Sequence, residues 1–211
     1  MIKFKKILFT FALLPLAMSC NNKADKAVAS NKEKVTNTQE SAILYKVNTS
    51  ESVIQWTGFK PTGSHTGTIN IESGMVYFNY NNLKSGSFTI DMNSIKDNDS
   101  SKRLEGHLKS ADFFDVENFA SATFDITGFE KRNGKSMLSG NLKLKDIENN
   151  ITFPVTESRD DDTYTLISEV FTIDRSKWNV RYGSKSFFDD LGDKFIDNDI
   201  ELKVIVKATK S

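Results

Sequence analysis

The chain has 211 residues, and its 28 basic and 28 acidic side chains give a formal net charge of zero at pH 7. This balance lacks the positive excess of nucleic-acid-binding proteins, so we expect no nucleic-acid partner. The single cysteine excludes an internal disulfide framework. The length suits one domain with a substantial hydrophobic core.

The N-terminus has the features of a bacterial lipoprotein signal peptide. Three lysines precede an apolar run at residues 7–16, which is too short to span a bilayer. Ala17 and Ser19 then place small residues before Cys20, in a pattern that resembles a lipobox. We therefore expect residues 1–19 to be removed and Cys20 to carry the lipid anchor. The alternative is an ordinary secretory signal with an incidental cysteine, which would leave an exported thiol without a disulfide partner.

These features predict a protein anchored in the bacterial cell envelope. Two or more acyl chains hold a protein stably at a membrane, and Asn21 after the cysteine favours the outer membrane over the inner one. Residues 20–42 are mostly polar, so we expect the acylated cysteine and a disordered tether there. The predicted domain is residues 43–211.

From Ile43 onward, apolar residues mostly recur at every second position, as in strands with one apolar and one polar face. Short connections such as Asn133-Gly134 indicate antiparallel neighbours. About eight such strands form either a closed barrel or a sandwich, and closure removes both sheet edges. The clearest strands are expected, in chain order, at 87–92, 122–127, 138–145, 151–155, 163–173 and 200–207.

The strand pattern is interrupted at residues 97–118 and again at 176–192. In the first segment, Leu104 and Leu108 have the spacing of a short amphipathic helix. Both segments are too rich in aromatic residues for solvent-exposed loops. They either cover one end of a barrel or form a separate hydrophobic cluster under a long connection.

The most specific part of the sequence is residues 106–124, where a polar helical turn runs into paired phenylalanines and then into a strand. This block resembles the signature of the YceI-like family, small lipocalin-like β-barrels that hold isoprenoids or other lipid-like amphiphiles. Further segments resemble the family in the same order along the chain, so that the resemblance covers residues 44–208. These segments are 56–67, 87–95, 140–155, 171–183 and 200–206.

The resemblance implies an all-β fold, namely an eight-stranded antiparallel lipocalin-like β-barrel with one or two short helices and an apolar tunnel. It implies that the partner is an isoprenoid, a quinone-like molecule or another fatty amphiphile, which the protein binds, carries or sequesters. The family has no general reaction, metal or cofactor to carry over. A second copy of the chain, in a homodimer, is a further partner that we consider.

The alternating pattern and the resemblance together select the side chains expected to line the tunnel. They are Phe88, Ile90, Met92, Phe113, Phe114, Phe124, Ile126, Leu142, Leu144, Phe153, Trp178, Leu202 and Val204. Trp56, in contrast, is expected to pack. Burying one CH₂ group contributes about 0.8 kcal/mol, whereas an exposed ion pair contributes about 0–1 kcal/mol. Tail length is therefore expected to dominate affinity.

Three polar residues are candidates for contacts at the tunnel mouth, namely His65, His107 and Arg175. The alternative for both histidines is structural hydrogen bonding, and for Arg175 it is an internal pair with Asp174. Neither the two histidines nor the acidic stretch 97–99 has the spacing of a known metal motif, so no metal is predicted.

No nucleophile elbow, phosphate loop or dinucleotide fingerprint occurs in the sequence, and no enzymatic activity is predicted. Two alternatives to a lipid-binding barrel remain. One is a non-catalytic structural or adhesive module of the envelope with a solid barrel. The other is a hydrolase acting on a lipid or glycan, which would need a polar pocket with perturbed titratable groups.

Overall fold

The computed structural model describes residues 23–35 and 42–211, so the predicted signal peptide and Cys20 lie outside the described residues. The described part is mostly β-structure, as predicted, with one α-helix, α1 (Lys102–Lys109), and two short 3-10 helices. Its strands are β1 (Val28–Asn31), β2 (Ile43–Val47), β3 (Val53–Lys60), β4 (Gly63–Asn79), β5 (Asn82–Asp97), β6 (Ser121–Arg132), β7 (Lys135–Leu144), β8 (Ile147–Arg159), β9 (Thr163–Ser168), β10 (Phe171–Asp174) and β11 (Asp199–Lys210). The 3-10 helices are η1 (Arg175–Trp178) and η2 (Gly192–Lys194).

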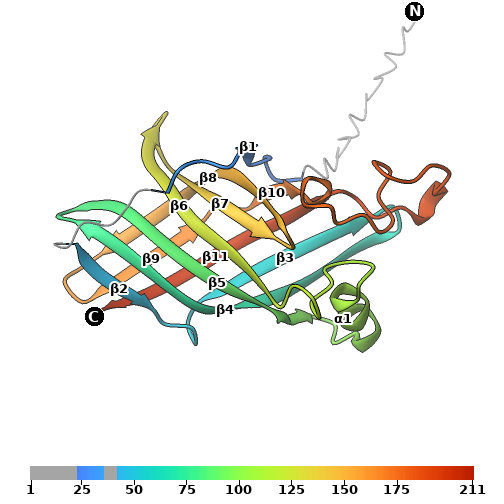
Figure 1. Ribbon diagram of the computed structural model, residues 1–211, viewed down its shortest axis with the longest axis horizontal. Helices are drawn as coiled ribbons and strands as arrows, with labels where there is room; N and C mark the ends of the chain where they lie inside the picture. Colours follow the sequence, from blue (N-terminus) through green and yellow to red (C-terminus); the bar gives the residue numbers. More distant parts are fainter. Residues whose placement is uncertain (1–22, 36–41) are drawn as a thin grey trace, which may run out of the picture.

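Eight strands close into an antiparallel barrel (Figure 1). In spatial order these are β3, β4, β5, β6, β7, β8, β9 and β11, and β11 pairs with β3 to complete the ring. This confirms the predicted lipocalin-like barrel. Because side chains alternate between the two faces of each strand, closure gathers the apolar half of every strand in the interior.

Two barrel strands are interrupted, and a serine hydroxyl bridges each interruption. The chain leaves the sheet between β2 and β3, where Ser52 Oγ accepts a hydrogen bond from Lys207 N at 3.0 Å. It leaves the sheet again between β9 and β10, where Ser168 Oγ accepts one from Val204 N at 2.8 Å. The single strand predicted at 163–173 is therefore two strands, and β11 keeps its hydrogen bonding across both breaks.

Helix α1 lies at one end of the barrel, and the C-terminus lies at the other end (Figure 1). The helix begins after Ser101, whose Oγ accepts a hydrogen bond from Leu104 N at 3.3 Å. Leu108 is buried and Leu104 packs against the core, as the predicted amphipathic spacing requires. No helix in the described part of the chain has the length and apolar character needed to cross a membrane.

Three aromatic rings fill the barrel interior at the end opposite α1. The ring centroid of Phe78 lies 5.6 Å from that of Tyr45 and 5.0 Å from that of Tyr164. All three side chains are buried. The guanidinium of Arg159 lies over the Phe78 ring, 4.4 Å from its centroid. We call Tyr45, Phe78 and Tyr164 the aromatic plug, because they close this end of the barrel.

The N-terminal segment corrects one prediction. The sequence predicts a disordered tether over residues 20–42, but residues 23–35 lie along the barrel. Strand β1 pairs with the edge of β8 that β9 leaves free, and Ala27 N donates to Thr172 O in β10 at 2.9 Å. The segment therefore pairs with two strands that would otherwise expose edges. Its polar composition gave no sign of this, since backbone groups make most of the contact.

Asn141 in β7 holds the end of this segment. Its side chain is fully buried, its Oδ1 accepts a hydrogen bond from Glu33 N at 3.0 Å, and its Nδ2 donates to Glu33 O at 2.7 Å. Asn150 Nδ2 also donates to Asn141 Oδ1 at 3.0 Å. The side-chain amide thus pairs with the Glu33 backbone as a neighbouring strand would.

Asn141→Leu is expected to lower the free energy of unfolding by about 2 kcal/mol, because it leaves buried polar groups without partners. It should also speed hydrogen exchange of the Glu33 amide. Urea denaturation and amide exchange measure the two effects. Asn93→Leu, at an exposed position of β5, is the control and should change neither. Unaltered exchange at Glu33 in Asn141→Leu would contradict this account of the segment.

Candidate ligand-binding cavity

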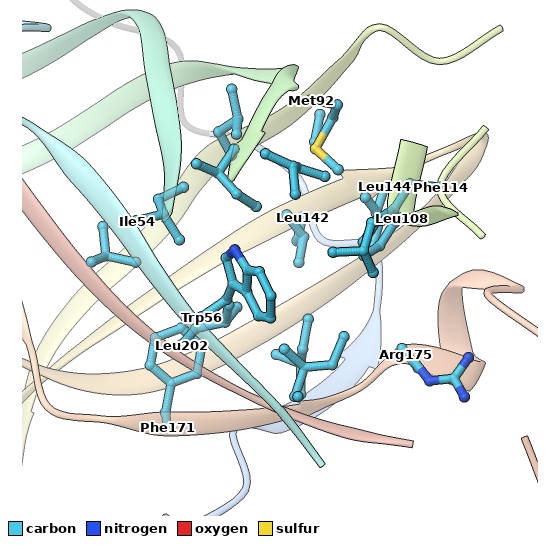
Figure 2. Close-up of a pocket in the computed structure, with 18 of the residues that line it drawn as sticks. Ile54, Trp56, Met92, Leu108, Phe114, Leu142, Leu144, Phe171, Arg175 and Leu202 are labelled. Atoms are coloured by element: carbon cyan, nitrogen blue, oxygen red, sulfur yellow. The ribbon is translucent and has the colours of Figure 1, made fainter. Parts of the chain in front are cut away.

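The barrel encloses an apolar cavity of about 330 Å³. Figure 2 shows side chains from several strands pointing into it, with the Trp56 indole projecting into the pocket. The volume is at the low end of the range of about 300–1,000 Å³ found for small-molecule sites. A void lined by carbon atoms binds by excluding water from an apolar ligand, so this site suits a hydrocarbon chain.

Most of the predicted tunnel residues line this cavity. They are Phe88, Ile90, Met92, Phe113, Phe114, Phe124, Leu142, Leu144, Phe153, Leu202 and Val204. They come from five strands and from the turn that follows α1, which explains how residues far apart in the sequence meet. Their role in ligand binding stays a prediction.

Two of the predicted tunnel residues lie elsewhere. Ile126 is buried, but it packs against Gly86 and not beside the cavity. Trp178 is fully buried, and its Nε1 donates to the backbone oxygen of Leu142 at 2.9 Å. Its ring faces a separate, smaller pocket beside Ala27 of the N-terminal segment. The prediction that Trp178 lines the tunnel was therefore wrong, because the sequence did not reveal the segment that covers it.

Trp56 lines the cavity, in addition to packing as predicted. It packs on Gly67 of the neighbouring strand β4, where a Cβ atom would lie 2.5 Å from the Trp56 ring. A larger residue at position 67 would thus clash with the indole and with the backbone oxygen of Lys96, which lies 1.9 Å from the same Cβ position. The absence of a side chain at Gly67 sets where the ring sits on the cavity wall.

Several other residues line the cavity that were not predicted from the sequence to lie there. They include Ile54, Ile69, Ile71, Ile95, Leu108, Leu138, Ile151, Leu166, Phe171, Ile173, Ile200 and Val206. Most continue the two-residue alternation of strands already recognised. Extending the alternation to β3 and β4 would have found Ile54, Ile69 and Ile71.

The cavity opens at the α1 end. None of the described residues that line it belongs to the aromatic plug. Its half-buried or exposed lining residues include Phe59, Lys60 and His65 on the β3–β4 hairpin and Leu104 and His107 on α1. We call these five residues the rim. A ligand inside would have its tail toward the plug and its head at the rim.

Both histidines lie at the rim, and their predicted contacts with a ligand stay a prediction. The His107 ring meets the Tyr182 ring edge-on, with centroids 4.4 Å apart, so it joins α1 to the 176–198 segment. His65 Nδ1 lies 3.6 Å from Asp97 Oδ1. His107 therefore has an aromatic setting, whereas His65 lies beside a carboxylate.

Arg175 lines the cavity, but most of its donors bind the backbone. Its Nε donates to Asp197 O, its Nη1 to Val180 O, and its Nη2 to both Tyr182 O and Ile196 O, at 2.6–3.1 Å. Burial lowers the pKa of this guanidinium to about 10, which leaves it charged at neutral pH. Arg175 therefore braces residues 176–198 through their backbone carbonyls, and not through the pair with Asp174 that was the alternative from the sequence. Its predicted contact with a ligand stays a prediction.

Residues 45–208 match the YceI-like domain, over more than half of the chain. The chain belongs to the YceI-like family. The family assignment agrees with the resemblance in the sequence and with the barrel in the structure.

Relatives of this YceI-like chain are distant. Protein YceI of Salmonella arizonae is 38% identical over 68 residues, which is 32% of each chain, so the match spans about a third of that relative. The crystal structure of Burkholderia cenocepacia BcnA is 24% identical, with a TM-score of 0.63 over 77% of this chain and 99% of BcnA. A polyisoprenoid-binding domain from Saccharophagus degradans, implicated in plant cell wall breakdown, is 12% identical, with a TM-score of 0.59 over 80% of this chain and 99% of that domain. Both structures share the fold.

Leu142→Trp is expected to weaken binding of an apolar probe such as N-phenyl-1-naphthylamine about tenfold. The larger ring would take the space of roughly two CH₂ groups, each contributing about 0.8 kcal/mol. Probe fluorescence titration measures the change. Lys143→Trp places the same ring on the outer face of β7, where Lys143 is exposed, and should leave probe affinity unchanged. Equal affinities of the two variants would place the probe outside the cavity.

Proposed function

We propose that this YceI-like protein binds an isoprenoid or another long-chain amphiphile in the barrel cavity and carries or sequesters it at the bacterial cell envelope. The observation that carries the proposal is the apolar cavity, whose lining reaches the rim, in a barrel whose opposite end is filled by the aromatic plug. A solid barrel, the alternative considered from the sequence, has no such cavity. The Saccharophagus degradans domain of the same fold, described as polyisoprenoid-binding, supports this class of ligand.

The cavity favours a ligand of modest length. At about 0.8 kcal/mol for each buried CH₂ group, affinity should rise with each added carbon until the chain reaches the aromatic plug. Beyond that length, additional carbons would remain in water and contribute little. The charged side chain at the rim is the exposed Lys60, and an ion pair at an exposed position contributes only about 0–1 kcal/mol, so the tail should dominate affinity.

The proposal also includes a lipid anchor at Cys20, in the outer membrane in preference to the inner one. The start of the described chain supports an orientation for the anchored barrel. Lys23 forms an ion pair with Asp197, which lines the cavity, and Ala24 N donates to Glu201 Oε1 at 2.7 Å. Three residues span at most about 10 Å. A membrane anchor at Cys20 would thus hold the open end of the barrel close to the bilayer.

Exposed aromatic residues on the 176–198 segment support the same orientation. This segment lies at the α1 end of the barrel (Figure 1), and Tyr182, Phe187 and Phe188 are 39–48% exposed on it. Arg181 lies over the Phe187 ring, 5.0 Å from its centroid. Aromatic rings next to cationic side chains suit the interface of a bilayer. Ligand exchange would then take place directly at the membrane surface.

The test of the ligand is native mass spectrometry of the protein purified from its own host, followed by a titration with fatty amphiphiles of increasing length. We expect a co-purified amphiphile and an affinity that rises about fourfold for each added CH₂ group, then reaches a plateau. Repeated recovery of ligand-free protein, with no dependence of affinity on chain length, would contradict lipid binding. A stoichiometric protein partner without lipid would favour the adhesive module.

The predicted orientation is tested by placing tryptophan at either end of the acylated protein in vesicles that contain brominated lipid. Bromine quenches nearby indoles, so Phe188→Trp fluorescence should fall strongly. Tyr80→Trp is the matched control, because Tyr80 is an exposed aromatic residue on the β4–β5 turn at the plug end. Unsubstituted protein provides the background from Trp56 and Trp178. Equal quenching at positions 188 and 80 would contradict the orientation and leave lipid binding itself untouched.

A further inference from the structure

Three potential metal ligands converge beside the rim, although 34 residues separate the first from the last. His65 lies in β4, Asp97 ends β5 and Asp99 follows in the next turn. One ligand atom of each lies within 4.8 Å of the others. In the part of the chain that the structure describes, no other group of three such residues meets this condition.

The backbone fixes this convergence. Gly67 pairs with Asp97 across β4 and β5, and beyond that pair Asn98 N donates to Thr66 O at 2.9 Å. Asn98 Nδ2 also donates to Thr66 Oγ1 at 3.0 Å. These two bonds extend the pairing of the two strands by one residue beyond Gly67 and Asp97. His65 and Asp99 are the next residues along these two segments, so the backbone holds them near each other.

Asp97 is the unusual member of the group. Its side chain is 0% exposed, and its Oδ2 accepts a hydrogen bond from Ser101 N at 3.1 Å. Its Oδ1 is buried and has no hydrogen-bond partner. The nearby Glu105 adds a second acid, and Lys102 is bonded to Glu105. A buried carboxylate oxygen without a partner is unfavourable unless a cation faces it.

His65 Nδ1 faces that oxygen and is also buried without a hydrogen-bond partner. The 3.6 Å between His65 Nδ1 and Asp97 Oδ1 exceeds the length of a normal hydrogen bond, about 2.7–3.2 Å. Two ligands of a tetrahedral zinc ion, with bonds of about 2.0–2.1 Å, lie roughly 3.4 Å apart. The distance therefore fits two ligand atoms of one metal ion better than it fits a direct hydrogen bond between His65 and Asp97.

We propose that His65, Asp97 and Asp99 bind a divalent transition metal ion, with Zn²⁺ as the ion that fits the set best. One imidazole nitrogen and two carboxylates are ligands that zinc accepts, whereas calcium takes six to eight oxygen atoms. Three protein ligands leave a fourth position of the zinc ion for water. This site does not depend on lipid binding. If the proposed function also holds, the fourth position lies beside the rim, where a ligand's head-group oxygen would take it.

The test uses the full chain, purified in detergent and stripped of metal with EDTA. Calorimetry with Zn²⁺ should show one ion bound for each chain, and Co²⁺ should give the absorption bands of a four-coordinate site. His65→Ala and Asp97→Asn should each lower Zn²⁺ affinity by about 100-fold or more, since loss of even an outer-shell partner lowers it about 10–100-fold. Asp99→Asn should act in the same direction.

His107→Ala is the matched control, because it removes the only other histidine, also at the rim, and should leave Zn²⁺ affinity unchanged. Thermal melting checks that Asp97→Asn remains folded, and His65→Ala tests the site independently if it does not. A Kd weaker than about 1 mM, or affinity unchanged in both variants, would overturn the proposal in favour of a simple His65–Asp97 ion pair. Binding of the apolar probe to the same samples reports on the cavity separately, so failure of the metal site and of the lipid site can be told apart.

Discussion

Hydrogen bonding around the closed ring is the constraint on which the rest of the molecule depends. With eight strands, the interior is wide enough either to be filled by side chains or to hold one small ligand. The ring stays closed where strands break, since Ser52 and Ser168 supply hydroxyls at the breaks and the N-terminal segment pairs with β8 and β10. Because the hydrogen-bonded ring fixes the width of the barrel, interior space that side chains do not fill remains a cavity.

The fold was largely predictable from the sequence, because alternation with a period of two reports directly which face of a strand is apolar. That signal placed Phe88, Ile90 and Leu142 on the inward faces of their strands, and these side chains line the cavity. The helix was predictable for the same reason, since the spacing of Leu104 and Leu108 matches one helical face. The family resemblance added closure and a hollow interior, which periodicity alone does not encode.

The features that the sequence did not reveal depend on register and on segments that come together only in the fold. Trp178 lines the smaller pocket beside the N-terminal segment and not the cavity, with its Nε1 bound to Leu142 O. Residues 23–35 join the sheet through backbone groups, which polar composition does not report. The approach of His65 to Asp97 follows from pairing between β4 and β5, so no spacing along the chain could indicate it.

The aromatic plug has a consequence for the kinetics of exchange. Because the plug fills the barrel end opposite the rim, a second amphiphile would not enter from that end and push the bound one out. If the proposed function holds, the bound amphiphile would have to leave through the rim, tail last, before a second one enters. The rate of exchange would then be independent of competitor concentration, and the time for which a cargo is retained would be a property of its own hydrocarbon length.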